Sequence, residues 1–179
     1  TKNLGCFGDG GLVTAKNKKV YESLLKLRTH GGIKRNQHDM IGYNSRLDEI
    51  QAAILDIKLK HINKLIKKRI DVAETYYKLI KNEKIRLPFR DINGKHTFNQ
   101  FTIRVKDRKK LEKHLKKHRI PYGIYYPKPI YKYKAYANYR CDDLPMVKKV
   151  SNQCLSLPIY PELEVKDIKL ISNVLNDYE

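Results

Sequence analysis

The chain lacks several features that would place it outside a reducing cell compartment. It has no tryptophan. It has only three cysteines, Cys6, Cys141 and Cys154, and these lie far apart and form no C-x-x-C pair. An odd number of widely spaced cysteines indicates neither a disulfide framework nor a zinc site. No apolar run approaches the ~18 residues of a membrane helix, and no signal-peptide pattern is present. We therefore expect a cytoplasmic protein that makes no membrane contact.

Acidic residues are also scarce, with 19 Asp and Glu against 38 Lys and Arg, so the formal net charge is +19. Such a charge attracts polyanions, and nucleic acid is the first partner to consider. However, the lysines are spread along the chain, and no dense basic stripe lies beside stacking aromatic residues. We expect the lysines to occupy solvated helix faces, and we keep a basic nucleic-acid-binding module as the alternative.

The chain of 179 residues suits one domain or a piece of a larger protein. It does not begin with Met, and it opens in the middle of a pattern, at Thr1-Lys2-Asn3. We expect it to be a fragment whose N-terminal portion is absent.

The first half of the sequence predicts one short strand and two helices. The glycine-rich turn 8–11 precedes a predicted strand over 12–15, and Asn17 is placed to cap a helix. After a loop over 29–43, a capping box at Ser45 predicts a helix that reaches about Ile80. A helix of ~35 residues is ~50 Å long, which is typical of a helix that joins two domains or lines a subunit interface.

The second half predicts a compact α/β unit. One strand is expected to include Phe98, Phe101 and residues 103–105, and a second to cover 122–126. Helices are expected after Asp107, over 146–154 and over 165–175. We predict two domains. Residues 1–80 form the C-terminal part of a large domain with the connecting helix, and residues 81–179 form a small C-terminal α/β domain.

Lys2 is the first candidate for chemistry, because a glycine-rich turn follows it. From the residues alone it is a phosphate contact, a Schiff-base lysine or an ordinary solvated lysine. The turn matches neither G-x-x-x-x-G-K-[ST] nor G-x-G-x-x-G, so the sequence indicates no P-loop and no nicotinamide site. His30, His38 and His96 lack metal-ligand spacing, and we expect no metal.

Four stretches together resemble the DegT/DnrJ/EryC1/StrS family of sugar aminotransferases. The first is Thr1-Lys2-Asn3-Leu4-Gly5-Cys6-Phe7-Gly8-Asp9-Gly10-Gly11, and the second is Gly42-Tyr43-Asn44-Ser45-Arg46-Leu47-Asp48-Glu49-Ile50-Gln51-Ala52-Ala53-Ile54. Weaker matches are Tyr126-Pro127-Lys128-Pro129 and Leu155-Ser156-Leu157-Pro158-Ile159-Tyr160-Pro161. The resemblance extends from Thr1 to about Leu175.

The resemblance implies an aspartate-aminotransferase-like α/β fold, PLP fold type I, of which this chain is the end of the large domain plus the small domain. It implies a homodimer with a shared active site, in which Lys2 carries pyridoxal 5'-phosphate (PLP) as a Schiff base. Asn44 then contacts the cofactor phosphate of the neighbouring subunit, and Arg46 faces the partner's substrate pocket. Tyr125 and Tyr126 border the sugar-nucleotide site.

The implied reaction transfers an amino group, from glutamate as the expected donor, to C3 or C4 of a nucleotide-linked keto sugar. An Asn amide donates to a phosphate without adding charge, and Arg makes a two-pronged contact with a phosphate or carboxylate. Each residue also has a purely structural interpretation. Asn44 and Arg46 precede a helix as cap or first-turn residues, and Tyr125 and Tyr126 lie in a predicted strand where tyrosine packs well.

Two departures from the family pattern concern the sugar. Members acting on sugar acids often have His at the position of Tyr125, and many members have His at the position of Tyr131. The resemblance also implies cofactor-binding elements that precede Thr1 in the family, so we expect the 179-residue chain alone to be inactive. A non-catalytic homologue on the same scaffold is a further alternative.

Overall fold

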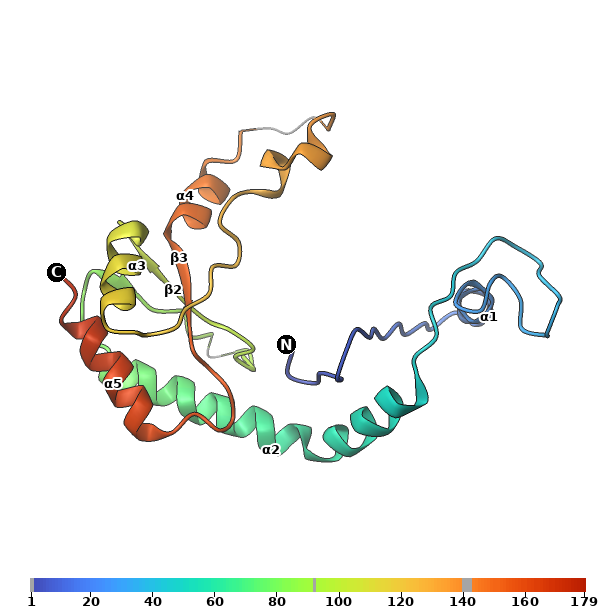
Figure 1. The fold of residues 1–179 in the computed structure, drawn as a ribbon, viewed down its shortest axis with the longest axis horizontal. Helices are drawn as coiled ribbons and strands as arrows, with labels where there is room; N and C mark the ends of the chain where they lie inside the picture. Colours follow the sequence, from blue (N-terminus) through green and yellow to red (C-terminus); the bar gives the residue numbers. More distant parts are fainter. Residues whose placement is uncertain (1, 92, 140–142) are drawn as a thin grey trace. The chain divides into compact units, whose positions relative to one another are not determined.

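The computed structural model describes residues 2–91, 93–139 and 143–179 (Figure 1). Thr1 and Cys141 of the sequence analysis lie outside the described residues. The chain divides into two compact units, residues 1–62 and 63–179, and the division falls inside helix α2. The predicted domain boundary at residues 80 and 81 stays a prediction.

The first unit contains α1 (Lys18–Leu27) and the beginning of α2 (Glu49–Leu79). Asn17 caps α1 as predicted, because its side-chain oxygen accepts from the backbone N–H groups of Lys19 and Val20. The predicted strand over 12–15 is wrong. Residues 12–15 pair with no other strand among the described residues, and a strand needs a neighbour to take up its backbone hydrogen bonds.

Helix α2 confirms the long helix but begins later than predicted. The backbone N–H of Ala52 donates to the Asp48 carbonyl at 2.9 Å, so the first helical bond starts at Asp48 and not at Ser45. The Ser45 N–H donates instead to the Arg28 carbonyl at 3.0 Å. The backbone around Ser45 is therefore part of the loop after α1, and the predicted capping box there is wrong.

A three-stranded antiparallel sheet in the order β1-β2-β3 forms the centre of the second unit. The strands are β1 (Ile85–Arg86), β2 (Phe101–Val105) and β3 (Cys154–Leu157). In the β2–β3 register, Phe101 lies opposite Leu157 and Ile103 opposite Leu155. The two strands therefore present their apolar side chains on one face.

Three helices of the second unit confirm the sequence predictions: α3 (Arg108–Lys117), α4 (Pro145–Gln153) and α5 (Val165–Asn176). Two short 3-10 helices, η1 (Ile130–Lys132) and η2 (Lys134–Tyr136), precede α4. The predicted strand over 122–126 is wrong. Only Gly123 forms a bridge, with Ser156, and Pro127 and Pro129 then prevent further ladder bonds because proline has no N–H.

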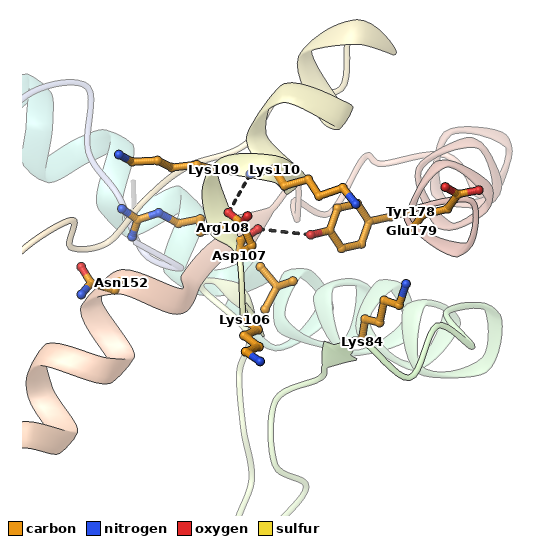
Figure 2. A pocket seen from close by; sticks show the side chains of 10 residues that line it. Lys84, Lys106, Asp107, Arg108, Lys109, Lys110, Asn152, Tyr178 and Glu179 are labelled. Carbon is orange, nitrogen blue, oxygen red and sulfur yellow. Dashed lines mark hydrogen bonds between the residues drawn. The ribbon is translucent and has the colours of Figure 1, made fainter.

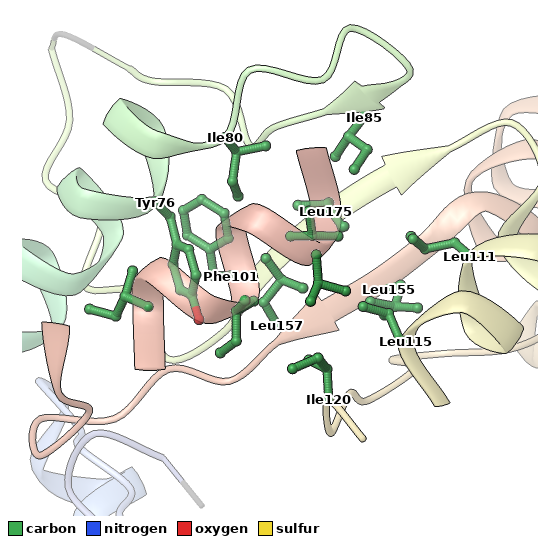
Figure 3. Packing of buried hydrophobic residues seen from close by; sticks show 14 of the residues in the cluster. Tyr76, Ile80, Ile85, Phe101, Leu111, Leu115, Ile120, Leu155, Leu157 and Leu175 are labelled. Atoms are coloured by element: carbon green, nitrogen blue, oxygen red, sulfur yellow. The ribbon is translucent and has the colours of Figure 1, made fainter. Parts of the chain in front are cut away.

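The hydrophobic core lies on the apolar face of this sheet (Figure 3). Tyr76 from α2 packs on Phe101 with ring centroids 5.0 Å apart, and both side chains are fully buried. Leu111 from α3 and Leu175 from α5 enter the same cluster and are also fully buried. Residues of α2, α3 and α5 thus close one side of the sheet, and burial of each such side chain stabilises the fold by about 1.5–3 kcal/mol.

The opposite face of the sheet is polar and meets α4. Thr102 and Ser156, opposite each other in the register, are joined by a hydroxyl hydrogen bond of 2.8 Å. Arg104 on the same face donates to Gln153 of α4 at 2.8 Å. The Thr102, Ser156 and Gln153 side chains on and beside this face therefore have hydrogen-bond partners.

None of the helices among the described residues combines the length and hydropathy needed to cross a membrane.

Candidate active site

The segment that carries Lys2 is held against the start of α2 within the first unit. The Gln51 side chain makes two hydrogen bonds to the backbone of Phe7. Its oxygen accepts from the Phe7 N–H at 2.7 Å, and its NH2 donates to the Phe7 carbonyl at 2.9 Å. The Lys58 ammonium donates to the Gly5 carbonyl and lies 5.9 Å from the Phe7 ring centroid. The side chain of Lys2 is exposed. The backbone that follows Lys2 is therefore fixed, while its amine is accessible.

Asn44 and Arg46 contact each other directly. The Arg46 Nε donates to the Asn44 Oδ1 at 3.2 Å, and both residues are exposed. This contact uses the acceptor atom of the Asn44 amide and the inner nitrogen of the guanidinium. The Asn44 NH2 and the two outer Arg46 nitrogens do not take part in this contact, and they are donors of the kind that a phosphate or carboxylate accepts from.

The loop over 29–43 is tied tightly to its own ends, which positions Asn44. Thr29 and Asn44 form a β-bridge, and the Tyr43 N–H donates to the Leu27 carbonyl at 2.7 Å. Gly31, at φ +87°, lies so close to Gly42 that a Cβ on Gly42 would lie 2.1 Å from the Gly31 nitrogen. A residue with a side chain at Gly42 would force the two backbone segments apart.

An ion pair holds the tip of the same loop to α1. The Lys26 Nζ lies 2.5 Å from the Asp39 Oδ2. The hydrogen bond and charge of the Lys26 ammonium lower the pKa of the Asp39 carboxyl below its ordinary value.

Tyr125 and Tyr126 lie in the second unit, beside a hollow of about 460 Å³ above the polar face of the sheet. Their rings are 6.1 Å apart at 79°, and they are 50% and 69% exposed, so neither is a core residue. The hollow is also lined by residues from β2, the 128–130 turn, α4 and β3: Thr102, Lys128, Pro129, Ile130, Met146, Val147, Val150, Ser151 and Cys154. The arrangement offers two phenol hydroxyls and one ammonium at the edge of an otherwise apolar depression.

Gly123 sets the position of the Tyr125 ring and was missed by the sequence analysis. It exchanges two backbone hydrogen bonds with Ser156, of 3.0 and 2.7 Å, which fixes this segment to the edge of β3. A Cβ on Gly123 would lie 2.6 Å from Cε2 of Tyr125, so the ring occupies the space that a side chain would fill. A single glycine in a predicted strand does not indicate that an aromatic ring packs against its backbone.

Gln51 and Lys58 were also missed as positioning residues. They are seven residues apart and lie on one face of α2, a spacing visible in the sequence. What the sequence did not show is that residues 5–7 lie against that face.

The structure joins some predicted site residues and not others. Asn44 contacts Arg46, and Tyr125 lies beside Tyr126. In the described part of the chain no hydrogen bond or ion pair connects Lys2 to Asn44 or Arg46. The roles predicted for these five residues therefore stay predictions. No group of three or more potential metal ligands occurs among the described residues.

Comparison with known proteins identifies the family. The model of the DegT/DnrJ/EryC1/StrS aminotransferase family matches residues 1–176. The chain belongs to this family. The recognition made from the Lys2 and Asn44 motifs is confirmed.

Two curated relatives are transaminases of nucleotide sugars. A UDP-2-acetamido-2-deoxy-3-oxo-D-glucuronate aminotransferase of Pseudomonas aeruginosa is 34% identical over 177 residues, which is 99% of this chain and 49% of the relative. A dTDP-3-amino-3,4,6-trideoxy-alpha-D-glucose transaminase of Streptomyces venezuelae is 38% identical over 166 residues, 91% of this chain and 44% of the relative. This chain thus spans about half the length of the curated relatives it matches.

A solved structure confirms the predicted fold. S. venezuelae DesV, crystallised in complex with a ketimine intermediate, superposes with a TM-score of 0.93 at 35% identity. The match covers 98% of this chain and 48% of DesV. The chain therefore has the mixed α/β fold of the C-terminal half of the family.

Proposed function

We propose that the whole protein is a PLP-dependent aminotransferase that places an amino group on a nucleotide-linked keto sugar. One observation carries the proposal: over nine-tenths of this chain aligns, at 34% and 38% identity, with relatives named as transaminases of UDP- and dTDP-sugars. The family model matches residues 1–176, a range that includes Lys2, Asn44 and Arg46, the residues to which we assign the chemistry.

The donor set around Asn44 fits the phosphate group of PLP. The Asn44 amide is neutral, so its NH2 donates without adding charge, and its oxygen already accepts from Arg46. Arg46 keeps its outer nitrogens for a two-pronged contact with a phosphate or a substrate carboxylate. Both side chains are exposed, and in the proposed homodimer they would face the neighbouring subunit's site.

Lys2 has two tasks in this proposal. Its amine would hold the cofactor, and when free it would act as the base and acid that moves a proton at the reacting carbon. When bound, PLP supplies the electron sink that makes this proton transfer feasible. The hydrogen bonds of Gln51 to Phe7 and of Lys58 to Gly5 limit the movement of the backbone that follows Lys2.

Tyr125 and Tyr126 would border the sugar nucleotide. The exposed phenols donate to and accept from sugar hydroxyls, and Lys128 at the rim neutralises part of the diphosphate charge. We further propose glutamate as the amino donor and a homodimer in the cytoplasm as the working form. The 179-residue chain alone is expected to lack turnover.

Reduction with borohydride tests the assignment of Lys2. In the whole protein with PLP, we expect a visible absorbance band from the bound cofactor, which borohydride bleaches. Mass spectrometry then locates the added mass on the peptide containing Lys2, and Lys2→Ala removes both the band and activity. Lys16→Ala, an exposed lysine outside the two motifs, serves as the control that keeps both. An adduct on another lysine would overturn the assignment.

A further inference from the structure

Positive charge is concentrated on α3 beyond the level of the rest of the chain. Residues 106–119 contain eight Lys and Arg against two acidic residues, whereas the whole chain has 38 against 19. The basic excess is thus fourfold on this segment and twofold overall. A general richness in lysine does not account for the difference.

Both acidic residues of the segment accept hydrogen bonds from neighbouring residues. The Asp107 carboxylate accepts from the Lys110 N–H at 3.0 Å and so caps α3. Glu112 accepts from the Arg108 Nε at 3.0 Å, and its second oxygen accepts from the Tyr122 hydroxyl at 3.3 Å. Among the described residues, neither carboxylate forms an ion pair with a lysine of this segment.

The outward lysines repel one another. Lys109, Lys113 and Lys117 follow at four-residue spacing on one helix face, and like charges at this spacing destabilise a helix. In the described parts of the chain, none of the three forms an ion pair with an acidic side chain. On α2, by contrast, Lys60 pairs with Asp56 at the same spacing, at 2.7 Å. An anion bound beside Lys109 would relieve part of this repulsion, at the end of the row that borders the hollow.

The start of α3 also borders an open hollow of about 920 Å³ (Figure 2). Its walls come from separate segments: Lys84 before β1, residues 105–110, Asn152 of α4, and Tyr178 and Glu179 after α5. Five cations line it against two carboxylates, those of Asp107 and Glu179, and the cations are Lys84, Lys106, Arg108, Lys109 and Lys110. The volume is in the range of small-molecule sites, which is about 300–1,000 Å³.

We propose that this hollow binds a compact polyphosphate, such as inorganic triphosphate or the triphosphate group of a nucleotide. Lysine ammoniums act as mobile point charges that suit the several oxygens of a polyphosphate. Arg108 contributes less than the lysines, because its charge is paired with Glu112 and its Nη1 donates to the Ser151 carbonyl. Asn152 adds an amide to the wall.

The surroundings favour a small anion over an extended one. Leu111 and Leu115, the apolar residues of α3, are fully buried, so the helix has no large apolar side chain to insert into a lipid surface. Tyr178 is only 6% exposed and offers no ring face for stacking a nucleic-acid base. The charge that remains lies on the walls of a hollow, where it surrounds a compact ligand from several sides.

This site is separate from the proposed sugar site. It shares no lining residue with the hollow beside Tyr125 and Tyr126. The inference therefore does not rest on the proposed function.

Titration calorimetry of the full chain with inorganic triphosphate at low salt tests the proposal. The hollow variant is Lys84→Ala/Lys106→Ala, and the charge-matched control on the outer face of α3 is Lys113→Ala/Lys117→Ala. All four lysines are exposed, and a thermal melt of each variant checks that the fold is retained. We expect the hollow variant to bind about tenfold more weakly or worse, because charged hydrogen bonds are lost, and the control to change by less than about twofold.

Three results would overturn the proposal. They are no binding by the unmodified chain, an equal loss in both variants, and a larger loss in the control. A duplex oligonucleotide and anionic lipid vesicles are titrated in parallel. Tighter binding to either one, with dependence on Lys113 and Lys117, would assign the charge to an extended polyanion and also overturn the proposal.

Discussion

Tyr76 shows how much one side chain contributes to this fold. It joins α2 to the segment after β3, because its hydroxyl donates to the Pro158 carbonyl at 2.9 Å while its ring packs on Phe101. Burial raises the pKa of Tyr76 well above its ordinary value, since the charged phenolate would lose its hydration. Burial also raises the pKa of Tyr77 and of Tyr178.

These shifts predict a loss of stability at alkaline pH. A group whose pKa is raised in the folded state stabilises the fold fully below its unfolded pKa, about 10 for tyrosine, and loses that contribution as pH rises toward the folded value. We expect the free energy of unfolding in urea to fall above about pH 10. Tyr76→Phe should lower the free energy of unfolding by about 1 kcal/mol at neutral pH, because a hydrogen bond is lost. It should also make the decrease of this free energy with rising pH less steep.

Tyr139→Phe is the matched control, because this tyrosine is 72% exposed. It should leave both the neutral stability and the slope unchanged. An alkaline slope that is the same in Tyr76→Phe and in the unmodified chain would contradict the assignment.

At the scale of single elements, α3 depends on its N-cap residue, Asp107. Asp107 provides the side-chain acceptor for the Lys110 N–H and, through its main-chain carbonyl, accepts from the Tyr178 hydroxyl at 3.2 Å. The second bond survives any side-chain change at this position. A substitution at Asp107 therefore removes the helix cap without removing the hydrogen bond from the Tyr178 hydroxyl.

We predict that Asp107→Ala lowers the free energy of unfolding by about 1 kcal/mol, because the N-terminal N–H groups of α3 lose their acceptor. Urea unfolding followed by circular dichroism measures the change. Asp107→Ser keeps a hydroxyl acceptor and should recover most of the loss. If the serine variant is as unstable as the alanine variant, the carboxylate charge beside the lysines matters and the cap does not.

At the scale of the whole molecule, the two units differ in how they are stabilised. Among the described residues of the first unit, no hydrophobic side chain is buried, and only Gly31 and Gly32 are. The second unit holds the hydrophobic core. Apolar burial is the main favourable contribution to folding, so the second unit alone has the means to fold independently.

We therefore expect residues 63–179, produced alone, to unfold cooperatively in urea, and residues 1–62, produced alone, to show no cooperative transition. Circular dichroism and intrinsic tyrosine fluorescence follow both transitions. A cooperative transition in the 1–62 piece would show that its helices are stable without a core, and would contradict this prediction.

Local patterns in the sequence determined most helices and the family. The Asn17 and Asp107 caps and the periodicity of Ile168, Ile171 and Leu175 depend on neighbours within a few residues, so α1, α3 and α5 were predictable. The Lys2 and Asn44 motifs identified the family in the same way. These features need no knowledge of distant contacts.

The strand β2 was predicted from the sequence, but the tertiary structure alone decided the other strands and the exact positions of the site residues. Cys154–Leu157 is a strand because β2, some fifty residues earlier, supplies its hydrogen bonds, whereas residues 12–15 and 122–126 look equally strand-like and have no ladder. In the same way, only the folded chain places Gln51 on Phe7 and the Tyr125 ring over Gly123. The physical reason is that a strand or a side-chain contact is satisfied by a partner far away in the sequence, while a helix satisfies its own backbone.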